Sequence, residues 1–231
     1  MIQELKKDIE KLADPVRAGH SARFFKTGPG QYGEGDKFVG LKVPEQRILA
    51  KKYRNLQLPD LKKLINSSVH EQRLTAVFIL VDRYKKSKNK QLEVEFYLEN
   101  LAGINNWDLV DSSAHKILGD FLLDKDRDIL YRLAKSNNLW QKRIAMISTF
   151  AFIPKKDFKD ALKIAEILLH DDHDLIHKAV GWTLREVGNR DRAAEEEFLK
   201  KHYKSMPRTA LRYAIEKFPE ELRQKYLKGE A

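Results

Sequence analysis

The fold is decided by the stretch from Ile65 to Val81, which reads INSSVHEQRLTAVFILV. Its apolar side chains recur with the 3.6-residue period of an amphipathic helix, at Ile65, Val69, Leu74, Val77, Phe78 and Val81. Similar spacing extends along almost the whole chain, and convincing alternating segments of strand length are missing. The sequence therefore predicts an all-α fold.

Prolines mark where several of these helices begin. A proline ring fixes φ and lacks an N–H group, so it suits the first turn of a helix. Helical patterns follow Pro44, Pro59, Pro154, Pro207 and Pro219. None of these prolines interrupts a strongly periodic segment, which agrees with the helical interpretation.

One long stretch is incompatible with a regular helix. Residues 27–40 read TGPGQYGEGDKFVG and hold five of the 11 glycines. We interpret this stretch as an ordered loop. It lacks the Gly-Lys-Ser/Thr ending and the preceding strand of a nucleotide-cradling loop, which argues against that role.

A weak internal repeat indicates how the helices are arranged. Short related segments each contain an alanine, and these alanines lie 38, 31, 34 and 31 residues apart, at Ala76, Ala114, Ala145, Ala179 and Ala210. This period accommodates two antiparallel helices and two turns, as in HEAT-like repeats. A small residue at the same place in each unit lets neighbouring helices approach closely. We therefore predict one domain over residues 1–231, an α-solenoid curved around a concave DNA-binding face; chance spacing of a common residue is the alternative.

Composition narrows the classes of function. The chain has 44 Lys and Arg against 34 Asp and Glu, a formal charge of +10 that suggests a polyanionic partner, either nucleic acid or a membrane surface. A basic protein that binds no DNA is the alternative. The absence of cysteine excludes disulfides, thiolate nucleophiles, iron-sulfur clusters and Cys-ligated zinc within the chain. With no secretory signal or membrane-spanning stretch in the pattern, we expect a cytoplasmic protein.

The segment Asn105–Asp111 combines a helix start with an unusual acid. Asn105 or Asn106 is the predicted cap. One side of the helix then carries, at helical spacing, Trp107, Val110, Ala114, Ile117, Leu118 and Phe121, with Asp111 among them. Asp108 points elsewhere and is explained by the helix dipole, which favours an acid in the first turn. An unpaired buried carboxylate is costly, so Asp111 is expected to be paired, to cap another helix or to face a cleft.

Two later helices carry groups that could complement Trp107 and Asp111. Trp140-Gln141-Lys142-Arg143 starts one predicted helix, and Trp182 and Arg185 lie on another. All three tryptophans fall on the second helices of the repeat units, which line the concave surface of a solenoid. For Trp140 simple packing is the favoured interpretation, and for Arg143 and Arg185 ordinary surface cations are the alternative.

These motifs resemble the AlkD family of DNA alkylation repair proteins. The similarity rests on NWDLVD at 106–111, WQKR at 140–143, KAVGWTLRE at 178–186 and the glycine-rich passage from Phe25 to Gly40. It runs over nearly the whole chain in the same order. Each motif alone is weak, and together they are specific.

The resemblance implies a glycosylase that removes N3- or N7-alkylated purines from duplex DNA. Matched by motif, its site comprises Asp111, Trp107 and Trp182 as catalytic residues and Arg143 as a phosphate contact; we add Arg185 as a second DNA-binding candidate. An alkylated purine is already cationic, so its departure needs no general acid and leaves an oxocarbenium-like sugar. Asp111 would stabilise that charge and orient water, and the tryptophans would pack against the deoxyribose. We expect no cofactor or metal, and a monomer.

Other features leave alternatives open. Basic residues that could neutralise phosphates occur in three groups, Lys42, Arg47, Lys51, Lys52 and Arg54, then Lys85, Lys86, Lys88 and Lys90, then Lys200, Lys201, Lys204, Arg208 and Arg212, although solvated helix surfaces are the alternative for each. His173 and His177 have metal-ligand spacing, but the segment also fits a loop with a helix cap. Besides the enzyme, we consider a non-catalytic repeat protein that binds bent or branched DNA, and a protein-interaction scaffold. Asp111 discriminates the enzyme from the DNA-binding protein, because a pure binder gains nothing from a carboxylate beside a polyanion. The charge of +10 and the scarcity of an exposed apolar groove in the pattern argue against the scaffold.

Overall fold

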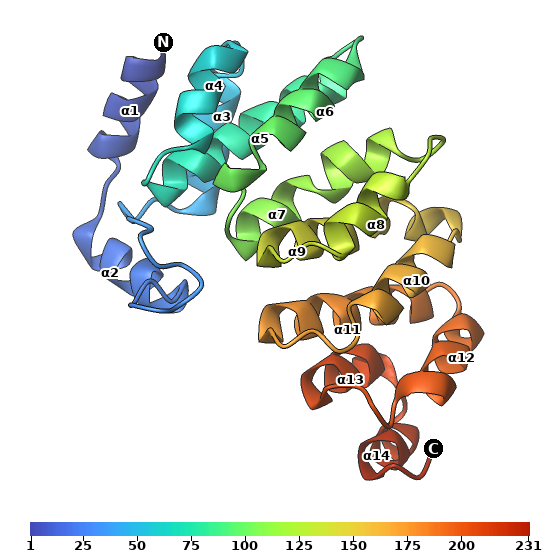
Figure 1. Ribbon diagram of the computed structural model, residues 1–231. Helices are drawn as coiled ribbons and strands as arrows, with labels where there is room; N and C mark the ends of the chain where they lie inside the picture. The colour runs from blue at the N-terminus through green and yellow to red at the C-terminus, as the bar shows by residue number, and fades with distance from the viewer. The chain divides into compact units, whose positions relative to one another are not determined.

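The computed structural model describes residues 1–231, and these residues form helices joined by turns and loops (Figure 1). No strand forms, and the one β-type pairing is an isolated bridge between Lys37 and Val69. The prediction of an all-α fold is therefore confirmed. The chain divides into two compact units, Met1–Ser113 and Ala114–Ala231. Each unit is described by itself, and the single curved solenoid stays a prediction.

Unit 1 is organised around α5, which is buried along most of its length. This helix packs against α3, α4, α6 and α7. The periodic stretch from Ile65 to Val81 spans the end of α4 and most of α5, with a break between them at residues 66–69. The helices are α1 (Ile2–Lys11), α2 (Pro15–Phe24), α3 (Val43–Lys52), α4 (Leu58–Ile65), α5 (His70–Lys86), α6 (Lys90–Glu99) and α7 (Trp107–Ser113), with a 3₁₀ turn at Leu101–Gly103.

Unit 2 is organised around α11, which packs against α9, α10, α12 and α13. It begins with a π-helical turn, His115–Gly119. Its helices are α8 (Asp128–Ala134), α9 (Leu139–Ser148), α10 (Lys159–Ile167), α11 (Asp174–Gly188), α12 (Arg192–His202), α13 (Arg208–Ala214) and α14 (Glu220–Lys228), with 3₁₀ turns at Thr149–Ala151, Ile153–Lys155 and Ile215–Lys217. None of the helices in the chain combines the length and the apolar character that crossing a membrane requires.

The prolines take the positions expected of them. Pro44 and Pro59 occupy the second positions of α3 and α4, and Pro207 and Pro219 directly precede α13 and α14. Pro154 lies in a 3₁₀ turn before α10. Each of these prolines lies where a backbone N–H group would have no acceptor within the helix, so the missing N–H costs nothing. The prolines therefore predicted these helix starts correctly.

The five regularly spaced alanines are all buried without residual exposure: Ala76, Ala114, Ala145, Ala179 and Ala210. Small residues bring helices close together where α11 packs against α13. A methyl group added at Gly181 would collide with the carbonyl oxygen of Ala210 and with Cβ of Tyr213. This close approach agrees with a packing role for the small residues, while membership of the HEAT-like class stays a prediction.

A buried acid lies between α11 and α12. Glu195 is 2% exposed, and its Oε1 has no hydrogen-bond partner. Its carboxyl packs against Gly188, where any side chain would collide with it. Burial raises the pKa of Glu195 from 4.5 to about 8, although the charge of Arg192 acts to lower it. Glu195 is therefore largely protonated at neutral pH.

This protonation makes the stability of the protein depend on pH. Glu195 favours folding fully below pH 4.5, and its contribution is lost as the pH rises through about 8. A pKa change of this size corresponds to roughly 5 kcal/mol between the two protonation states. Glu195→Gln stays uncharged, so we expect it to be more stable than the wild type at pH 9, by up to roughly 5 kcal/mol, and similar to it at pH 5.

Urea unfolding of both proteins at several pH values measures the difference. The matched control is Glu197→Gln, because Glu197 lies on the same helix with an exposed side chain paired to Lys201. The control should leave the pH profile nearly unchanged. A wild type and Glu195→Gln variant with parallel pH profiles would show that Glu195 ionises normally.

Candidate functional site

The start of α7 is fixed by a buried asparagine. The side-chain Oδ1 of Asn106 accepts a hydrogen bond from the backbone N–H of Trp107 at 2.8 Å. Its Nδ2 donates to Oδ2 of Asp36 in the glycine-rich loop at 3.2 Å. The predicted cap is confirmed, with Asn106 as the residue that provides it.

Trp107 belongs to an aromatic cluster. Its ring stacks on Phe25 with centroids 5.2 Å apart and an interplanar angle of 13°. Phe25 stacks in turn on Phe38 at 5.0 Å, and Phe24 meets Trp107 edge to face at 6.0 Å. Trp107 itself is half-buried. The end of α2 and the glycine-rich loop thus hold one side of this tryptophan and leave part of it accessible.

Asp111 follows Trp107 by one helical turn and lies on the same side of α7. Val110, Ala114 and Ile117 on the predicted apolar face are fully buried, whereas Asp111 is half-buried. Burial raises the pKa of Tyr97, and the charge of Asp111 raises it further. The carboxylate therefore lies at the margin of the apolar face, where it reaches both the protein interior and the surface.

Asp108 has a partner that the sequence did not reveal. Its Oδ2 lies 2.8 Å from Nε2 of His70, the first residue of α5. The other ring nitrogen of His70, Nδ1, lies 3.4 Å from Oδ2 of Asp36. The same oxygen of Asp36 pairs with Nη2 of Arg73 at 2.6 Å. The first-turn dipole therefore explains only part of why an acid stands at Asp108.

We call Asp36, His70, Arg73 and Asp108 the buried charge cluster. Burial alone would lower the pKa of His70, but the hydrogen bonds to Asp108 and Asp36 outweigh it and raise the pKa. For Asp36, burial acts to raise the pKa, and the bonds to His70 and Arg73 lower it overall. The cluster thus places two carboxylates against the imidazole of His70 and the guanidinium of Arg73, and it joins the glycine-rich loop, α5 and α7.

Sequence reasoning missed this cluster, although one local signal was available. His70 and Arg73 stand at i and i+3, just before the apolar run Leu74–Val81, and side chains at this spacing share a helix face. Asp36 is separated from His70 by 34 residues, so no local pattern joins them.

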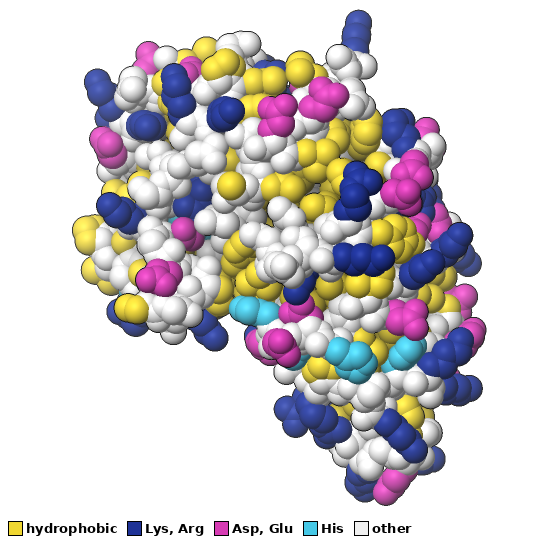
Figure 2. All heavy atoms as spheres, in the orientation of Figure 1, with side chains coloured by type: hydrophobic (Ala, Val, Ile, Leu, Met, Phe, Trp, Pro, Cys, Tyr) yellow, Lys and Arg dark blue, Asp and Glu magenta, His cyan; other side chains and the backbone are white.

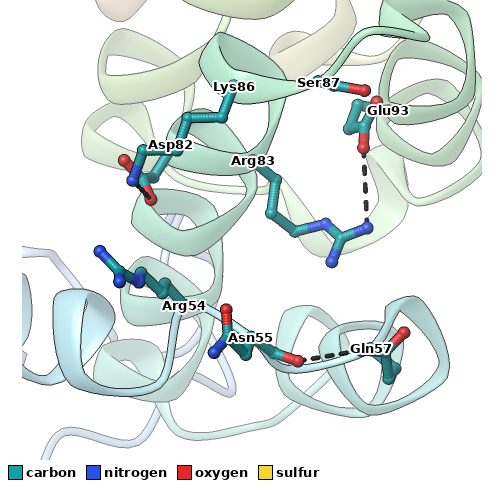
Figure 3. A pocket seen from close by; sticks show the side chains of 8 residues that line it. All are labelled: Arg54, Asn55, Gln57, Asp82, Arg83, Lys86, Ser87 and Glu93. Carbon is teal, nitrogen blue, oxygen red and sulfur yellow. Dashed lines mark hydrogen bonds and ion pairs between the residues drawn. The ribbon is translucent and has the colours of Figure 1, made fainter.

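Two pockets in unit 1 differ in chemistry. One of about 370 Å³ lies beside the buried charge cluster and is lined by Phe25, Phe38, His70 and Asp108 among others. The other, of about 690 Å³, is lined by polar and charged residues (Figure 3). In it Lys86 pairs with Asp82 at 2.6 Å and Arg83 with Glu93 at 3.6 Å. Of these two pockets only the smaller one includes a residue of α7, Asp108, and neither is lined by Trp107 or Asp111.

Unit 2 carries the other predicted site residues. Trp182 on α11 is half-buried and meets Phe150 edge to face at 4.7 Å. Arg185, one turn on, forms an ion pair with Glu216. Trp107 and Asp111 belong to unit 1, and the convergence of all the predicted residues on one patch stays a prediction.

Arg143 and Trp140 on α9 are both buried. Arg143 is 5% exposed and donates from Nη1 to the carbonyl oxygen of Leu175 at 2.6 Å. The alternative of an ordinary surface cation is therefore wrong for Arg143. The packing interpretation of Trp140 is confirmed.

The histidines at metal-ligand spacing take local structural positions. Nδ1 of His173 accepts a hydrogen bond from the backbone N–H of Leu175 at 3.1 Å and so caps α11. Nε2 of His177 is hydrogen-bonded to the carbonyl oxygen of Asp171. The interpretation as a loop with a helix cap is confirmed.

All three basic groups predicted from the sequence lie at the surface. On the face shown in Figure 2, Lys and Arg side chains are frequent over the C-terminal helices. This end of unit 2 includes Lys200, Lys201, Lys204, Arg208 and Arg212, all of them exposed. A surface with this many exposed Lys and Arg side chains could neutralise the phosphates of a polyanion. That these cations and those of unit 1 share one DNA-binding face stays a prediction.

Comparison with known proteins bears on the fold and on the family of the chain. Among solved structures, a predicted DNA alkylation repair enzyme from Enterococcus faecalis aligns with a TM-score of 0.73 and 19% sequence identity, over 90% of this chain and 97% of the other. At that identity the likeness concerns the fold. No curated protein matches the chain. A family model described as DNA alkylation repair enzyme matches residues 5–218, and because it spans most of the sequence, the chain belongs to the DNA alkylation repair enzyme family.

Proposed function

We propose that this protein is a DNA glycosylase that hydrolyses the N-glycosidic bond of cationic N3- or N7-alkylated purines in duplex DNA. The observation that carries the proposal is the pairing of Trp107 and Asp111 on one side of α7, both half-buried. Family membership supplies the class of substrate, alkylated DNA. We further propose that the protein acts as a monomer on DNA in the cytoplasm.

The chemistry follows from the charge of the lesion. An alkylated purine is a cation, so it departs as a neutral base and needs no proton donor. The positive charge moves to the sugar, which becomes oxocarbenium-like. An ionised Asp111 stabilises that charge and orients the water that attacks C1′. The π face of Trp107 contributes a weaker attraction to the same charge.

We also propose roles for three residues of unit 2. Trp182 has accessible surface and packs against the deoxyribose in this proposal. Arg143 and Arg185 are assigned to the DNA backbone. Arg185 already pairs with Glu216, so binding a phosphate exchanges one anionic partner for another. Arg143 holds the start of α11 through Leu175, and its buried guanidinium contributes positive charge near the bound strand.

The catalytic role of Asp111 is testable directly. We expect the wild type to release 7-methylguanine from a methylated duplex. Asp111→Asn keeps the shape of the side chain and removes its charge, so the single-turnover release rate should fall by about 100- to 1000-fold. DNA binding and the unfolding midpoint should change little.

The matched control is Asp124→Asn, which removes one negative charge from an exposed side chain on the surface of unit 2. It should release base at the wild-type rate. Binding of duplex without any release by the wild type would favour the non-catalytic DNA-binding protein instead. Full activity in Asp111→Asn would remove Asp111 from the mechanism.

Trp182 provides a second prediction. Loss of its ring in Trp182→Ala removes a π face from the cationic transition state, so we expect the release rate to fall by roughly 2- to 30-fold. Trp140→Phe is the control, because Trp140 is buried. Trp140→Phe should lower the thermal unfolding midpoint and keep the release rate of the folded protein. Equal rate losses in the two variants would assign Trp182 to packing alone.

A further inference from the structure

The larger pocket of unit 1 has a lining of one chemical kind. All of the residues that line it are polar or charged, and none is aromatic (Figure 3). Its volume of about 690 Å³ lies in the range of small-molecule sites. It lies where the turn between α3 and α4 meets the end of α5 and the start of α6. We call it the polar pocket.

The polar pocket is remote from the buried charge cluster. Arg83 and Lys86 line it from the last turns of α5, whereas His70 is the first residue of that helix. Because α5 has 17 residues, its two ends are about 25 Å apart. Neither Trp107 nor Asp111 lines the polar pocket. A ligand held there would therefore bind apart from the residues proposed for base release.

Glu93 gives the polar pocket a buried acid that accepts no hydrogen bond. It is 3% exposed, and its Oε2 has no hydrogen-bond partner. Its Oε1 lies 3.6 Å from Nη2 of Arg83, which is beyond hydrogen-bonding distance. Nε of Arg83 is also buried without a partner. Proteins pair nearly all buried polar groups, so Glu93 and Arg83 mark the place where a ligand gains most from hydrogen bonding.

The other side of the polar pocket favours an anion. Figure 3 shows Arg54 away from Glu93, close to the ion pair of Lys86 with Asp82. Arg54 is exposed and forms no ion pair, hydrogen bond or ring contact. Three cations and two acids line the pocket, which leaves an excess of positive charge. A free guanidinium matches the oxygens of a phosphate group and binds them through strong, charge-assisted hydrogen bonds.

We propose that the polar pocket binds a sugar phosphate, a function separate from base release. The phosphate pairs with Arg54, and the hydroxyl groups of the sugar donate to Glu93. Neutral hydroxyls suit Glu93 better than an ammonium group does, because the guanidinium of Arg83 repels a second cation at the same carboxyl. The lining has no aromatic ring on which a nucleobase could stack, so the sugar and its phosphate are the parts that are recognised.

Calorimetric titration of the full chain with ribose 5-phosphate tests the site. We expect saturable binding with a dissociation constant below about 1 mM. Ribose and inorganic phosphate each make only part of the contacts, so each should bind at least roughly 10-fold more weakly. Absence of saturable binding up to about 10 mM ribose 5-phosphate would overturn the proposal. Equal affinity for inorganic phosphate would overturn it too, because the hydroxyl contacts would then contribute nothing.

Two variants locate the bound sugar phosphate. Arg54→Gln removes the free cation, and Glu93→Gln removes the buried charge while keeping the shape of the side chain. Each should weaken binding of ribose 5-phosphate by roughly 10- to 100-fold. The matched control is Arg132→Gln, which changes an exposed arginine on α8 and should bind as the wild type does.

Thermal unfolding shows which variants are folded. Arg54 is exposed, so Arg54→Gln should fold even if loss of the buried charge in Glu93→Gln disturbs the packing. Wild-type affinity for ribose 5-phosphate in a folded Arg54→Gln variant contradicts the proposed site.

Duplex binding separates the polar pocket from the surface that holds DNA. Fluorescence anisotropy with an unmodified duplex, at one salt concentration, should give the same affinity for the wild type and for Arg54→Gln. If Arg54→Gln weakens duplex binding as much as it weakens binding of ribose 5-phosphate, the pocket contacts the DNA backbone and the proposal is wrong. Failure of base release leaves these measurements unchanged, so the two proposals stand or fall separately.

Discussion

Unit 1 depends on one buried electrostatic arrangement, the imidazole of His70 held between Asp36 and Asp108. Removing one partner from such a group leaves an uncompensated buried charge, which typically costs about 3–5 kcal/mol. The loop that contains Asp36 has little regular structure of its own, so its position relative to α5 and α7 is set by these contacts. Glu71 adds to them by accepting hydrogen bonds from the backbone of Val39 and Gly40.

The aromatic cluster packs against the same histidine, His70. The rings of Phe38 and Phe25 lie 4.6 and 4.9 Å from that of His70, and Phe25 carries Trp107 on its other side. Two contacts therefore fix Trp107: Asn106 accepts a hydrogen bond from its backbone N–H, and Phe25 stacks on its ring. Such support on a packed scaffold is what a site needs to hold a reacting group in one geometry.

Local physics made much of this structure predictable from sequence. The apolar period identified helices, the prolines identified their starts, and Asn106 was one of two predicted caps. Contacts between distant segments were not accessible in the same way. Asp108 was assigned to the helix dipole because its partner His70 lies 38 residues away. The acceptor of buried Arg143 is the carbonyl oxygen of Leu175, which lies in another helix. Phe24 is exposed, although a phenylalanine in an amphipathic helix is ordinarily expected to be buried.

The arrangement of His70 also bears on how the protein survives the agents that damage its substrate. Alkylating agents attack lone pairs, most readily those of thiolates and neutral imidazoles. The chain has no cysteine, and both nitrogens of the buried His70 are engaged with carboxylates that favour its protonated form. Neither ring nitrogen is open to solvent, because Nε2 lies against Asp108 and Nδ1 lies against Asp36 and Arg73. With 2% of its surface exposed, the residue on which unit 1 depends offers no accessible lone pair to an alkylating agent.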